Sequence, residues 1–263
     1  MNSRNTDTPK LPDWLPQVPD GMRILITGAS GGLGTALVKM LIDGSKNCVV
    51  GAHGATKNAA AADDPHVISI LRPIDNEADC IAVVDDFHIK AGGIDALVTL
   101  SGRIHFSGHW MDMPEADWTD DIDINLNHPF FLARHAMKLM KSAGKGGRVI
   151  LNGTESALHG GSAMSFPYAI AKRGTECLVE GLARDGAPDQ ILVNGVRLGC
   201  IESGFHERWH NKSAAEMAER INLIPLKRAG SPDEVAAMIC FLLSGWSGFI
   251  TGQMIPITGG DWL

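Results

Sequence analysis

The sequence contains few cysteines and no arrangement of them that points to a disulfide frame or a zinc site. The five cysteines, at positions 48, 80, 177, 200 and 240, are scattered, odd in number and form no CxxC pair. Such a pattern favours reduced thiols, as found in a cytoplasmic protein. We therefore expect cytoplasmic localisation.

Long apolar runs and an excess of basic residues are also missing. No window reaches the roughly 18 continuous apolar residues that a membrane-spanning helix requires. The net charge of −7, from 23 Lys and Arg against 30 Asp and Glu, argues against nucleic acids and anionic membranes as partners. Residues 1–21 are polar and rich in proline, and we interpret them as a surface arm that could dock through Trp14 and Leu15.

What the chain does contain is a series of apolar stretches of strand length. They cover residues 23–27, 48–52, 67–71, 95–99, 148–152, 191–196 and 253–257, and helix-length amphipathic segments separate them. The stretches are rich in Val and Ile and do not alternate with polar residues, which is typical of parallel strands covered on both faces. The pattern predicts one α/β domain over residues 22–263, a Rossmann-like doubly wound parallel sheet of about seven strands.

A glycine-rich turn follows the first predicted strand. The segment "TGASGGLG", residues 27–34, leads from that strand into a helical pattern. Glycine permits a positive φ and lets the backbone approach a pyrophosphate closely, and the helix N-terminus offers free N–H groups to the same anion. The turn therefore predicts a dinucleotide site formed by Gly28, Ser30, Gly32, Leu33 and Gly34; an ordinary glycine-rich turn is the alternative.

The chain has a single tyrosine. Tyr168 lies in "FPYAIAK", residues 166–172, and Lys172 follows four positions later. On a helix these two side chains share one face. A free phenol has a pKa near ~10, and a nearby ammonium favours the phenolate. The pair is thus a candidate acid/base, and a packed aromatic ring beside a surface lysine is the alternative.

Together the glycine spacing and "YAIAK" resemble the short-chain dehydrogenase/reductase family in its classical form. Further similar segments are residues 92–102, 123–131, 191–203 and 224–260, so the resemblance covers roughly residues 22–260. It implies an enzyme that transfers a hydride between a nicotinamide cofactor and a carbonyl or alcohol carbon. In that role Tyr168 would transfer the proton, and Lys172 would hold the ribose and lower the pKa of the phenol.

The resemblance also implies further site residues. The family usually places a serine 13 residues before the tyrosine, which is Glu155 here, but the local sequence fits better if Thr154 supplies the hydroxyl, with Ser156 as second choice. A carboxylate at that position would oppose a developing alkoxide. Asn125 matches the asparagine that organises a relay water, with Asn127 as the alternative. The remaining expected cofactor contacts are Gly102, Ile201 and Ser203.

Cofactor selectivity can be argued from the end of the second predicted strand. A site selective for NAD places a carboxylate there to bind the ribose 2′-hydroxyl. No Asp or Glu occurs between Asp43 and Asp63, whereas His53, Thr56 and Lys57 are available to bind a 2′-phosphate. NADP(H) is therefore the favoured cofactor, and NAD(H) is the alternative.

By the same resemblance, residues 103–113, His159, Met164, Phe166 and residues 204–223 should form the walls of the substrate cleft. The aromatic residues among them, Phe106, Trp110, Phe166 and Trp209, suit an apolar or ring-bearing carbonyl compound, and core packing is the alternative. Histidines 105, 109, 159, 206 and 210 show no metal-binding spacing, so no metal is expected. The resemblance implies a homotetramer or homodimer, packed through the long helices that begin near Asn125 and Tyr168.

Three functions remain open on the sequence alone. The first is an NADP(H)-dependent reductase of a 3-oxoacyl thioester or another ketone. The second is an NAD-dependent dehydrogenase of a sugar, a steroid or an aromatic diol. The third is a non-catalytic regulator that binds a nucleotide.

Overall fold

The structure is a computed structural model, and it describes residues 17–261 except 46, 59, 60, 62, 107, 211 and 212. The predicted docking residues of the arm, Trp14 and Leu15, lie outside the described residues, as do the side chains of Trp209 and His210. Within the predicted arm, Val18 is buried in the hydrophobic core.

A single seven-stranded sheet, parallel throughout, forms the centre of the molecule. Its strands are β1 (Arg23–Thr27), β2 (Val49–His53), β3 (Val67–Ile70), β4 (Ala96–Thr99), β5 (Gly147–Thr154), β6 (Ile191–Leu198) and β7 (Met254–Ile257). Their order across the sheet is β3-β2-β1-β4-β5-β6-β7. All seven predicted strands are present, so the predicted doubly wound α/β fold is confirmed.

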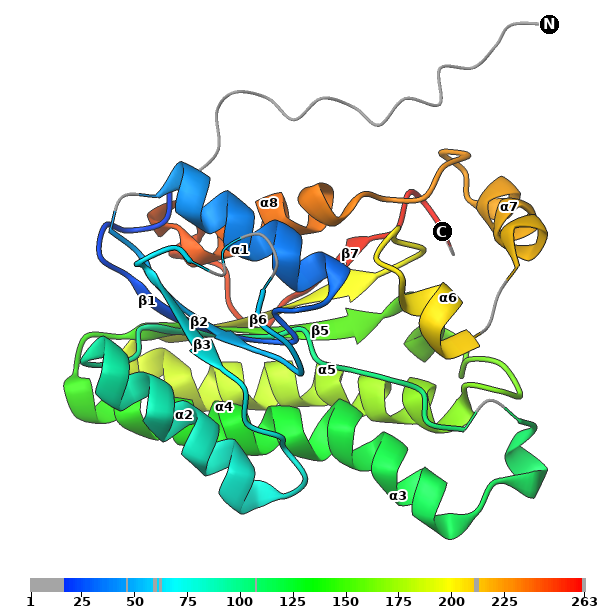
Figure 1. Ribbon diagram of the computed structural model, residues 1–263, viewed down its shortest axis with the longest axis horizontal. Coiled ribbons are helices and arrows are strands. Elements are labelled where there is room, and N and C mark those ends of the chain that lie inside the picture. Colours follow the sequence, from blue (N-terminus) through cyan, green and yellow to red (C-terminus); the bar gives the residue numbers. More distant parts are fainter. Residues whose placement is uncertain are drawn as a thin grey trace, which may run out of the picture.

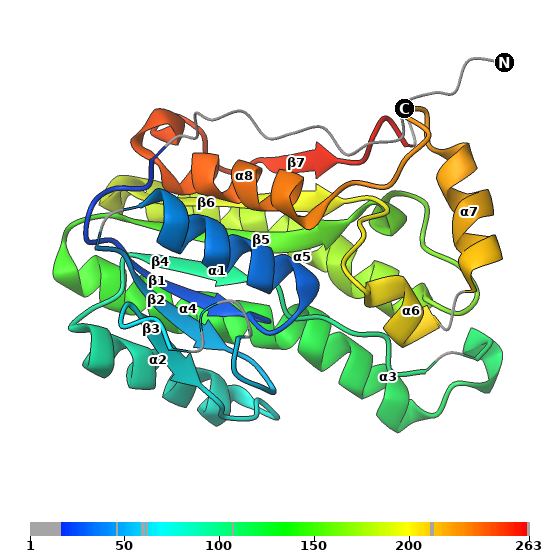
Figure 2. The ribbon, with the colours of Figure 1, turned by 45° about the horizontal axis from the view of Figure 1, so that its top comes forward.

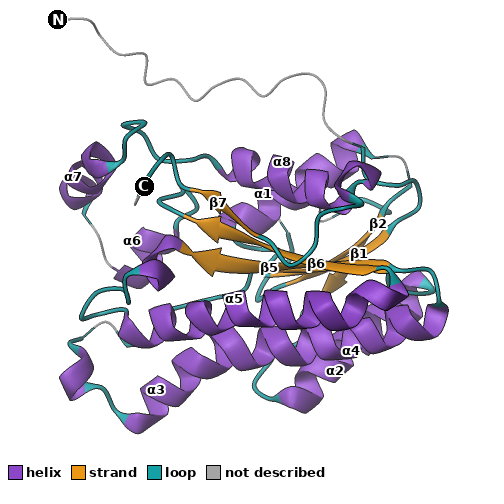
Figure 3. Ribbon diagram, turned by 180° about the vertical axis from the view of Figure 1, so that it is seen from behind, coloured by secondary structure: helices purple, strands orange, loops and turns teal. Residues whose placement is uncertain are grey.

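Helices cover both faces of the sheet (Figure 1). One face carries α1 (Gly32–Gly44) and α8 (Pro232–Leu243), and the other carries α2 (Glu77–Ala91), α4 (His128–Ala143) and α5 (Phe166–Gly186), which are also seen from behind in Figure 3. Each layer buries its own apolar cluster against the sheet. This burial on both faces explains why the strand sequences are apolar without alternation.

Shorter elements gather where the strands end. They are α3 (Glu115–Ile122), α6 (Phe205–His210), α7 (Ala214–Leu223), the π-helical turn η2 (Asp123–Asn127) and the 3₁₀ turns η1 (Trp110–Asp112) and η3 (Glu155–Leu158). The 3₁₀ turns η4 (Ala187–Asp189) and η5 (Gly245–Ser247) lie at the opposite edge, before β6 and β7. The strand arrows in Figure 2 point toward α6 and α7. Ligands of doubly wound sheets bind at this carboxyl edge.

Local sequence signals fix several helix ends. At the start of α8, Ser231 and Glu234 form a reciprocal capping box, and Pro232 is the first helical residue. Asn76 caps α2 by accepting a hydrogen bond from the N–H of Asp79, and Gly92 ends the helix with a left-handed φ of 70°.

The register of the sheet places the ends of several strands at one level. Thr27 of β1 pairs with His53 of β2 and with Thr99 of β4, and Thr154 of β5 pairs with Leu198 of β6. The residues that follow these positions therefore converge on one edge.

Candidate active site

The glycine-rich turn passes between β1 and α1 with very little space around it. Gly28 has a φ of +76°, and a Cβ added there would lie 2.7 Å from the backbone nitrogen of Ser101. At Gly34 an added Cβ would lie 2.3 Å from the carbonyl oxygen of Gly28. Side chains at these two positions would therefore require the backbone to move, because real Cβ atoms do not approach so closely.

All five predicted residues of this turn line one cavity of about 280 Å³, which we call the glycine-turn cavity. Helix α1 opens onto it with no acidic residue in its first turn and no side-chain cap. Its free N–H groups and the positive end of its dipole are available to an anion. Both observations fit the pyrophosphate of a dinucleotide.

His53 ends β2 beside this cavity, but its ring is held from within the protein. Its Nε2 lies 2.7 Å from the carbonyl oxygen of Arg72, and since a carbonyl only accepts, Nε2–H is the donor. Burial lowers the pKa of His53, so the ring is neutral at neutral pH. His53, which was expected to help bind a 2′-phosphate, therefore lies beside the cavity as a neutral ring.

A second, mostly apolar cavity of about 410 Å³ adjoins His53 on the α4 side of the sheet. We call it the His53 cavity. It shares His53, Gly54, Ala55, Ser101 and Ile124 with the glycine-turn cavity. Its size and lining suit a flat, largely apolar group such as a nucleobase.

Tyr168 and Lys172 lie on α5 at the other end of the glycine-turn cavity. Tyr168 lines a small cavity of about 90 Å³ together with Thr154 and Ser156, which we call the tyrosine cavity. The Nζ atom of Lys172 lies 5.8 Å from the centre of the Tyr168 ring, and the lysine side chain is fully buried. Gly102, Ser203 and Leu33 line both cavities, so the two are continuous.

The ionisation of this pair differs from the expectation that the lysine lowers the pKa of the phenol. Burial raises the pKa of Tyr168 to about 12, although hydrogen bonding to Thr154 acts in the opposite direction. Burial also lowers the pKa of Lys172 to about 7. Both charged forms are destabilised because water is excluded and no carboxylate compensates. In the protein alone the phenol is therefore protonated at neutral pH.

Thr154 is the last residue of β5 and lines the tyrosine cavity, as Ser156 does. The Oγ1 atom of Thr154 accepts a hydrogen bond of 3.4 Å from the N–H of Ser156. Glu155 between them is buried and burial raises its pKa, but it does not line the cavity. Both hydroxyls thus have access to a ligand, and the intervening carboxyl group does not.

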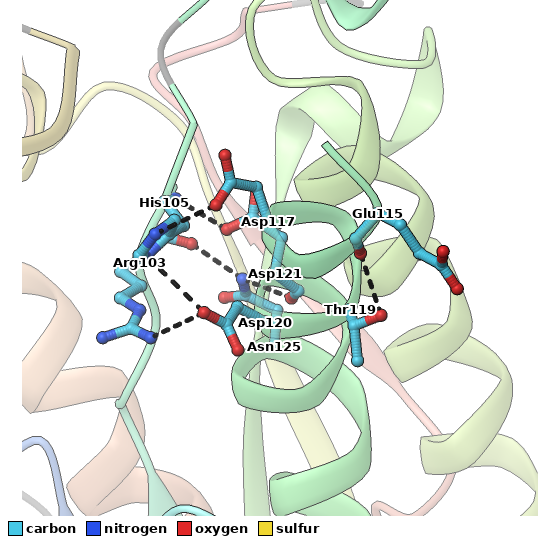
Figure 4. A network of polar contacts seen from close by, with 8 residues as sticks. All are labelled: Arg103, His105, Glu115, Asp117, Thr119, Asp120, Asp121 and Asn125. Atoms are coloured by element: carbon cyan, nitrogen blue, oxygen red, sulfur yellow. Dashed lines mark hydrogen bonds and ion pairs between the residues drawn. The ribbon is translucent and has the colours of Figure 1, made fainter. Parts of the chain in front are cut away.

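Asn125 is buried in η2, where its amide nitrogen donates to the carbonyl oxygens of Arg103 (2.7 Å) and Asp121 (2.9 Å). Figure 4 shows how these contacts join α3 and η2 to the loop after β4. Among the described residues, nothing bonds the side-chain oxygen of Asn125. An added Cβ at Gly102 would lie 3.0 Å from that oxygen and 3.6 Å from the Nζ of Lys172.

The same network contains several carboxylates on α3. Asp121 accepts a hydrogen bond of 2.6 Å from the backbone N–H of His105. The Nε2 atom of the His105 ring lies 3.2 Å from the Oδ1 atom of Asp117. The loop that carries Gly102 is therefore anchored to α3 (Figure 4).

Comparisons with known proteins agree with this arrangement. A family model described as enoyl-(acyl carrier protein) reductase matches residues 28–261. The 3-oxoacyl-[acyl-carrier-protein] reductase FabG of Vibrio cholerae is 30% identical over 253 residues, which cover 93% of this chain and 98% of the relative. The chain belongs to the short-chain dehydrogenase/reductase family. It is accordingly an NAD(P)(H)-dependent oxidoreductase that acts on CH–OH or C=O groups.

Two further similarities show the breadth of this family. L-rhamnose 1-dehydrogenase (NAD(P)(+)) of Azotobacter vinelandii is 29% identical over 256 residues, covering 90% of this chain and 95% of the relative. The crystal structure of levodione reductase superimposes with a TM-score of 0.83 at 24% identity and covers 92% of this chain and 98% of that chain. The latter similarity concerns the fold alone.

The sequence analysis did not single out Asn152, and it expected Phe205 and Arg208 only as members of the wall segment 204–223. Asn152 lines the tyrosine cavity, Arg208 lines the glycine-turn cavity, and Phe205 lines both. The signal for Asn152 was available, since it precedes Thr154 by two residues on the same strand and so shares its face. No motif marks Phe205 or Arg208, because the position of α6 depends on the tertiary fold.

The other predicted residues fall partly at the site. Ile201 lines the tyrosine cavity, as does His206, while the rings of Trp110 and Phe166 lie 5.9 Å apart and remain partly exposed. Among the described residues, no group of His, Cys, Asp or Glu is arranged to hold a metal ion. The five cysteines, all of them within the described residues, form no disulfide. In the described part of the chain no helix has the length and apolar character of a membrane span.

Proposed function

We propose that the protein is an NADP(H)-dependent reductase of a ketone or a 3-oxoacyl compound. The observation that carries this proposal is the continuity between the tyrosine cavity, with Tyr168 and Thr154, and the glycine-turn cavity. A dinucleotide that occupied the second cavity would reach the first. The similarity to a 3-oxoacyl-[acyl-carrier-protein] reductase supports the substrate class.

The bound cofactor would supply a hydride to the carbonyl carbon. Tyr168 donates its phenolic proton to the carbonyl oxygen, and the protonated state of the phenol at neutral pH suits that role. The hydroxyl of Thr154 hydrogen-bonds the same oxygen, with Ser156 as the alternative donor. The Lys172 ammonium stabilises the phenolate that remains and binds hydroxyl groups of the cofactor ribose. Asn125 orders the route by which the phenol regains its proton.

The preference for NADP(H) rests on charge. Among the described residues that line the glycine-turn cavity there is no Asp or Glu, whereas Arg103 and Arg208 are both present. Thr56 and Lys57 follow β2 on the exposed side of the adjoining loop. A 2′-phosphate would therefore meet positive charge and no carboxylate, with His53 as a neutral neighbour.

The expected assembly is a homotetramer or homodimer that packs through α4 and α5, and the expected location is the cytoplasm. Size-exclusion chromatography with light scattering checks the first expectation directly.

The function is tested by following NADPH oxidation with a panel of ketones and 3-oxoacyl thioesters, and NAD reduction with sugars and diols. We expect turnover in the first set, and a loss of about 100- to 10,000-fold in kcat for Tyr168→Phe, which removes only the proton donor. Binding of NADPH to Tyr168→Phe, measured by calorimetry, should change little and serves as the control.

Turnover confined to NAD with sugars would favour the second candidate, a sugar dehydrogenase. The similarity to L-rhamnose 1-dehydrogenase is the observation that supports this candidate. Cofactor binding without any turnover would instead indicate a non-catalytic regulator.

A further inference from the structure

The fully buried ammonium of Lys172 has an amide as its hydrogen-bond partner. The Nζ atom donates a bond of 3.0 Å to the Oδ1 atom of Asn152. Asn152 is itself buried, with 7% of its surface exposed. It lies on β5, two residues before Thr154, and both side chains line the tyrosine cavity.

The surroundings of Lys172 make this bond important. In the described part of the chain Asn152 is the only residue that accepts a hydrogen bond from the ammonium. Burial is the sole cause of the lowered pKa of Lys172, which means that no carboxylate supports its charge. The Tyr168 ring lies beside the ammonium on the same helix, and Gly102 brings its backbone close to both the ammonium and the unpartnered amide oxygen of Asn125 on η2.

We propose that Asn152 is a positioning residue, whose carbonyl oxygen keeps the Lys172 ammonium charged and directed into the site. This rests on the proposed function for its catalytic meaning, but the contact itself is a property of the protein alone. An acceptor dipole favours the charged form of its donor. An apolar side chain at position 152 would remove the one acceptor that the described residues give to this fully buried ammonium.

The orientation of the amide follows from the same bond. Because Oδ1 faces the ammonium, the NH2 group of Asn152 points away from Lys172 and leaves the carbonyl oxygen fixed as the acceptor. An aspartate would have the same shape with a negative charge. Leucine has a similar volume and no acceptor. These two substitutions therefore change the charge environment of Lys172 in opposite directions.

The decisive measurement needs no cofactor. The free energy of unfolding in urea is measured from pH 5 to 10 for the wild type, Asn152→Leu and Asn152→Asp, each compared with the same protein carrying Lys172→Met. The folded pKa of Lys172 lies below that of the unfolded chain, so the unfolded state binds the extra proton between the two values. The lysine's contribution to stability must therefore rise with pH, starting at its folded pKa.

In the wild type this rise should begin near pH 7, the pKa to which burial brings Lys172. We expect Asn152→Leu to move the onset down by about one pH unit and Asn152→Asp to move it up, in the directions that charge stabilisation dictates. The pH midpoint of NADPH binding, followed by calorimetry, should shift in the same directions. Asn152→Leu should also lower kcat/KM at pH 7 by about fivefold, because a pKa lowered by about one unit from 7 leaves roughly a tenth of the lysine protonated at that pH instead of half.

Asn194→Ser is the matched control. Asn194 is a buried asparagine on the neighbouring strand β6, where its side chain bonds only the backbone of Ile250 and Gln253. Its substitution should lower the melting temperature without moving the onset for Lys172. An unchanged onset in Asn152→Leu would overturn the proposal. A wild type that binds no nicotinamide dinucleotide would instead refute the proposed function, and the unfolding data would still decide the role of Asn152.

Discussion

At the scale of single residues, the site combines groups whose burial is costly. Lys172 is completely buried, and Tyr168 is held in its neutral form by the same exclusion of water. Neither arrangement favours folding. In the proposed function their presence together beside Thr154 serves proton transfer, for which a low-dielectric site strengthens every polar contact.

Lys172→Met should therefore increase the free energy of unfolding, because it replaces a buried charged group with an apolar side chain. The lowered pKa of Lys172 corresponds to a burial cost of the order of 4 kcal/mol at pH 7, at about 1.4 kcal/mol per pKa unit. Leaving Asn152 unpaired offsets about 1–3 kcal/mol of this. We expect a net gain of about 1–3 kcal/mol at pH 7 in urea unfolding, with little or no turnover.

The gain should be constant below pH 7 and shrink as the pH rises from 7 toward 10, since the unfolded lysine then loses its proton as well. Lys138→Met, at an exposed position on α4, is the control and should show no such pH dependence. A Lys172→Met protein less stable than the wild type at pH 7 would contradict the argument.

At the scale of secondary-structure elements, the sequence located every strand but shortened two of them. The predicted strands 148–152 and 191–196 continue to Thr154 and Leu198, where Gly153 still pairs with Arg197 and Thr154 with Leu198. Backbone pairing thus extends past the apolar pattern that was used to predict the strands. The added ends, Thr154 and Leu198, line the tyrosine cavity. The ends of β5 and β6, which the apolar pattern does not predict, are therefore the parts of these strands that lie at the candidate site.

Residues contributed by helices outside the family motifs could not be predicted in this way. Tyr168 and Lys172 were found because their spacing is fixed within one helix. Phe205 and Arg208 belong to α6, whose position depends on where the chain after β6 returns to the sheet, and no local pattern encodes this. The neutral state of His53 likewise depends on its burial in the folded chain, and its ring bonds the carbonyl oxygen of Arg72, which follows another strand.

Arg208 provides a test of the role of α6. Its exposed side chain lines the glycine-turn cavity, where it can bind a phosphate. We expect Arg208→Ala to weaken NADPH binding about five- to tenfold at low salt and less at high salt, because exposed charges are screened. Calorimetry at two salt concentrations measures this.

Arg184→Ala, at an exposed position in the last turn of α5, is the matched control and should bind NADPH as the wild type does. Equal affinities for Arg208→Ala and Arg184→Ala would show that α6 does not contact the cofactor.

At the scale of the whole molecule, three connected cavities run along one edge of the sheet. The glycine-turn cavity shares lining residues with the His53 cavity on one side and with the tyrosine cavity on the other. A ligand that fills them would contact β1, β2, β5, β6, α1, α4, α5 and α6 at once. Its binding must therefore stabilise the fold as a unit, because the elements it joins belong to both apolar layers.

The size of this stabilisation distinguishes the two cofactors. A ligand at 100 times its Kd adds about 2.7 kcal/mol to the free energy of unfolding, which corresponds to a rise of roughly 5–10 °C in melting temperature for a chain of this size. We expect NADPH to produce such a rise and NADH at the same concentration to produce about 1 °C, since only NADPH gains from the positive charge near the end of β2.

Lys57→Glu should reduce the NADPH effect and leave the NADH effect unchanged, because a carboxylate repels the 2′-phosphate and not the 2′-hydroxyl. Differential scanning fluorimetry of both proteins with both cofactors measures all four values. A wild-type rise that is larger with NADH would assign the site to NAD(H), and Thr56, Lys57 and the two cavity arginines would then have no part in selecting the cofactor.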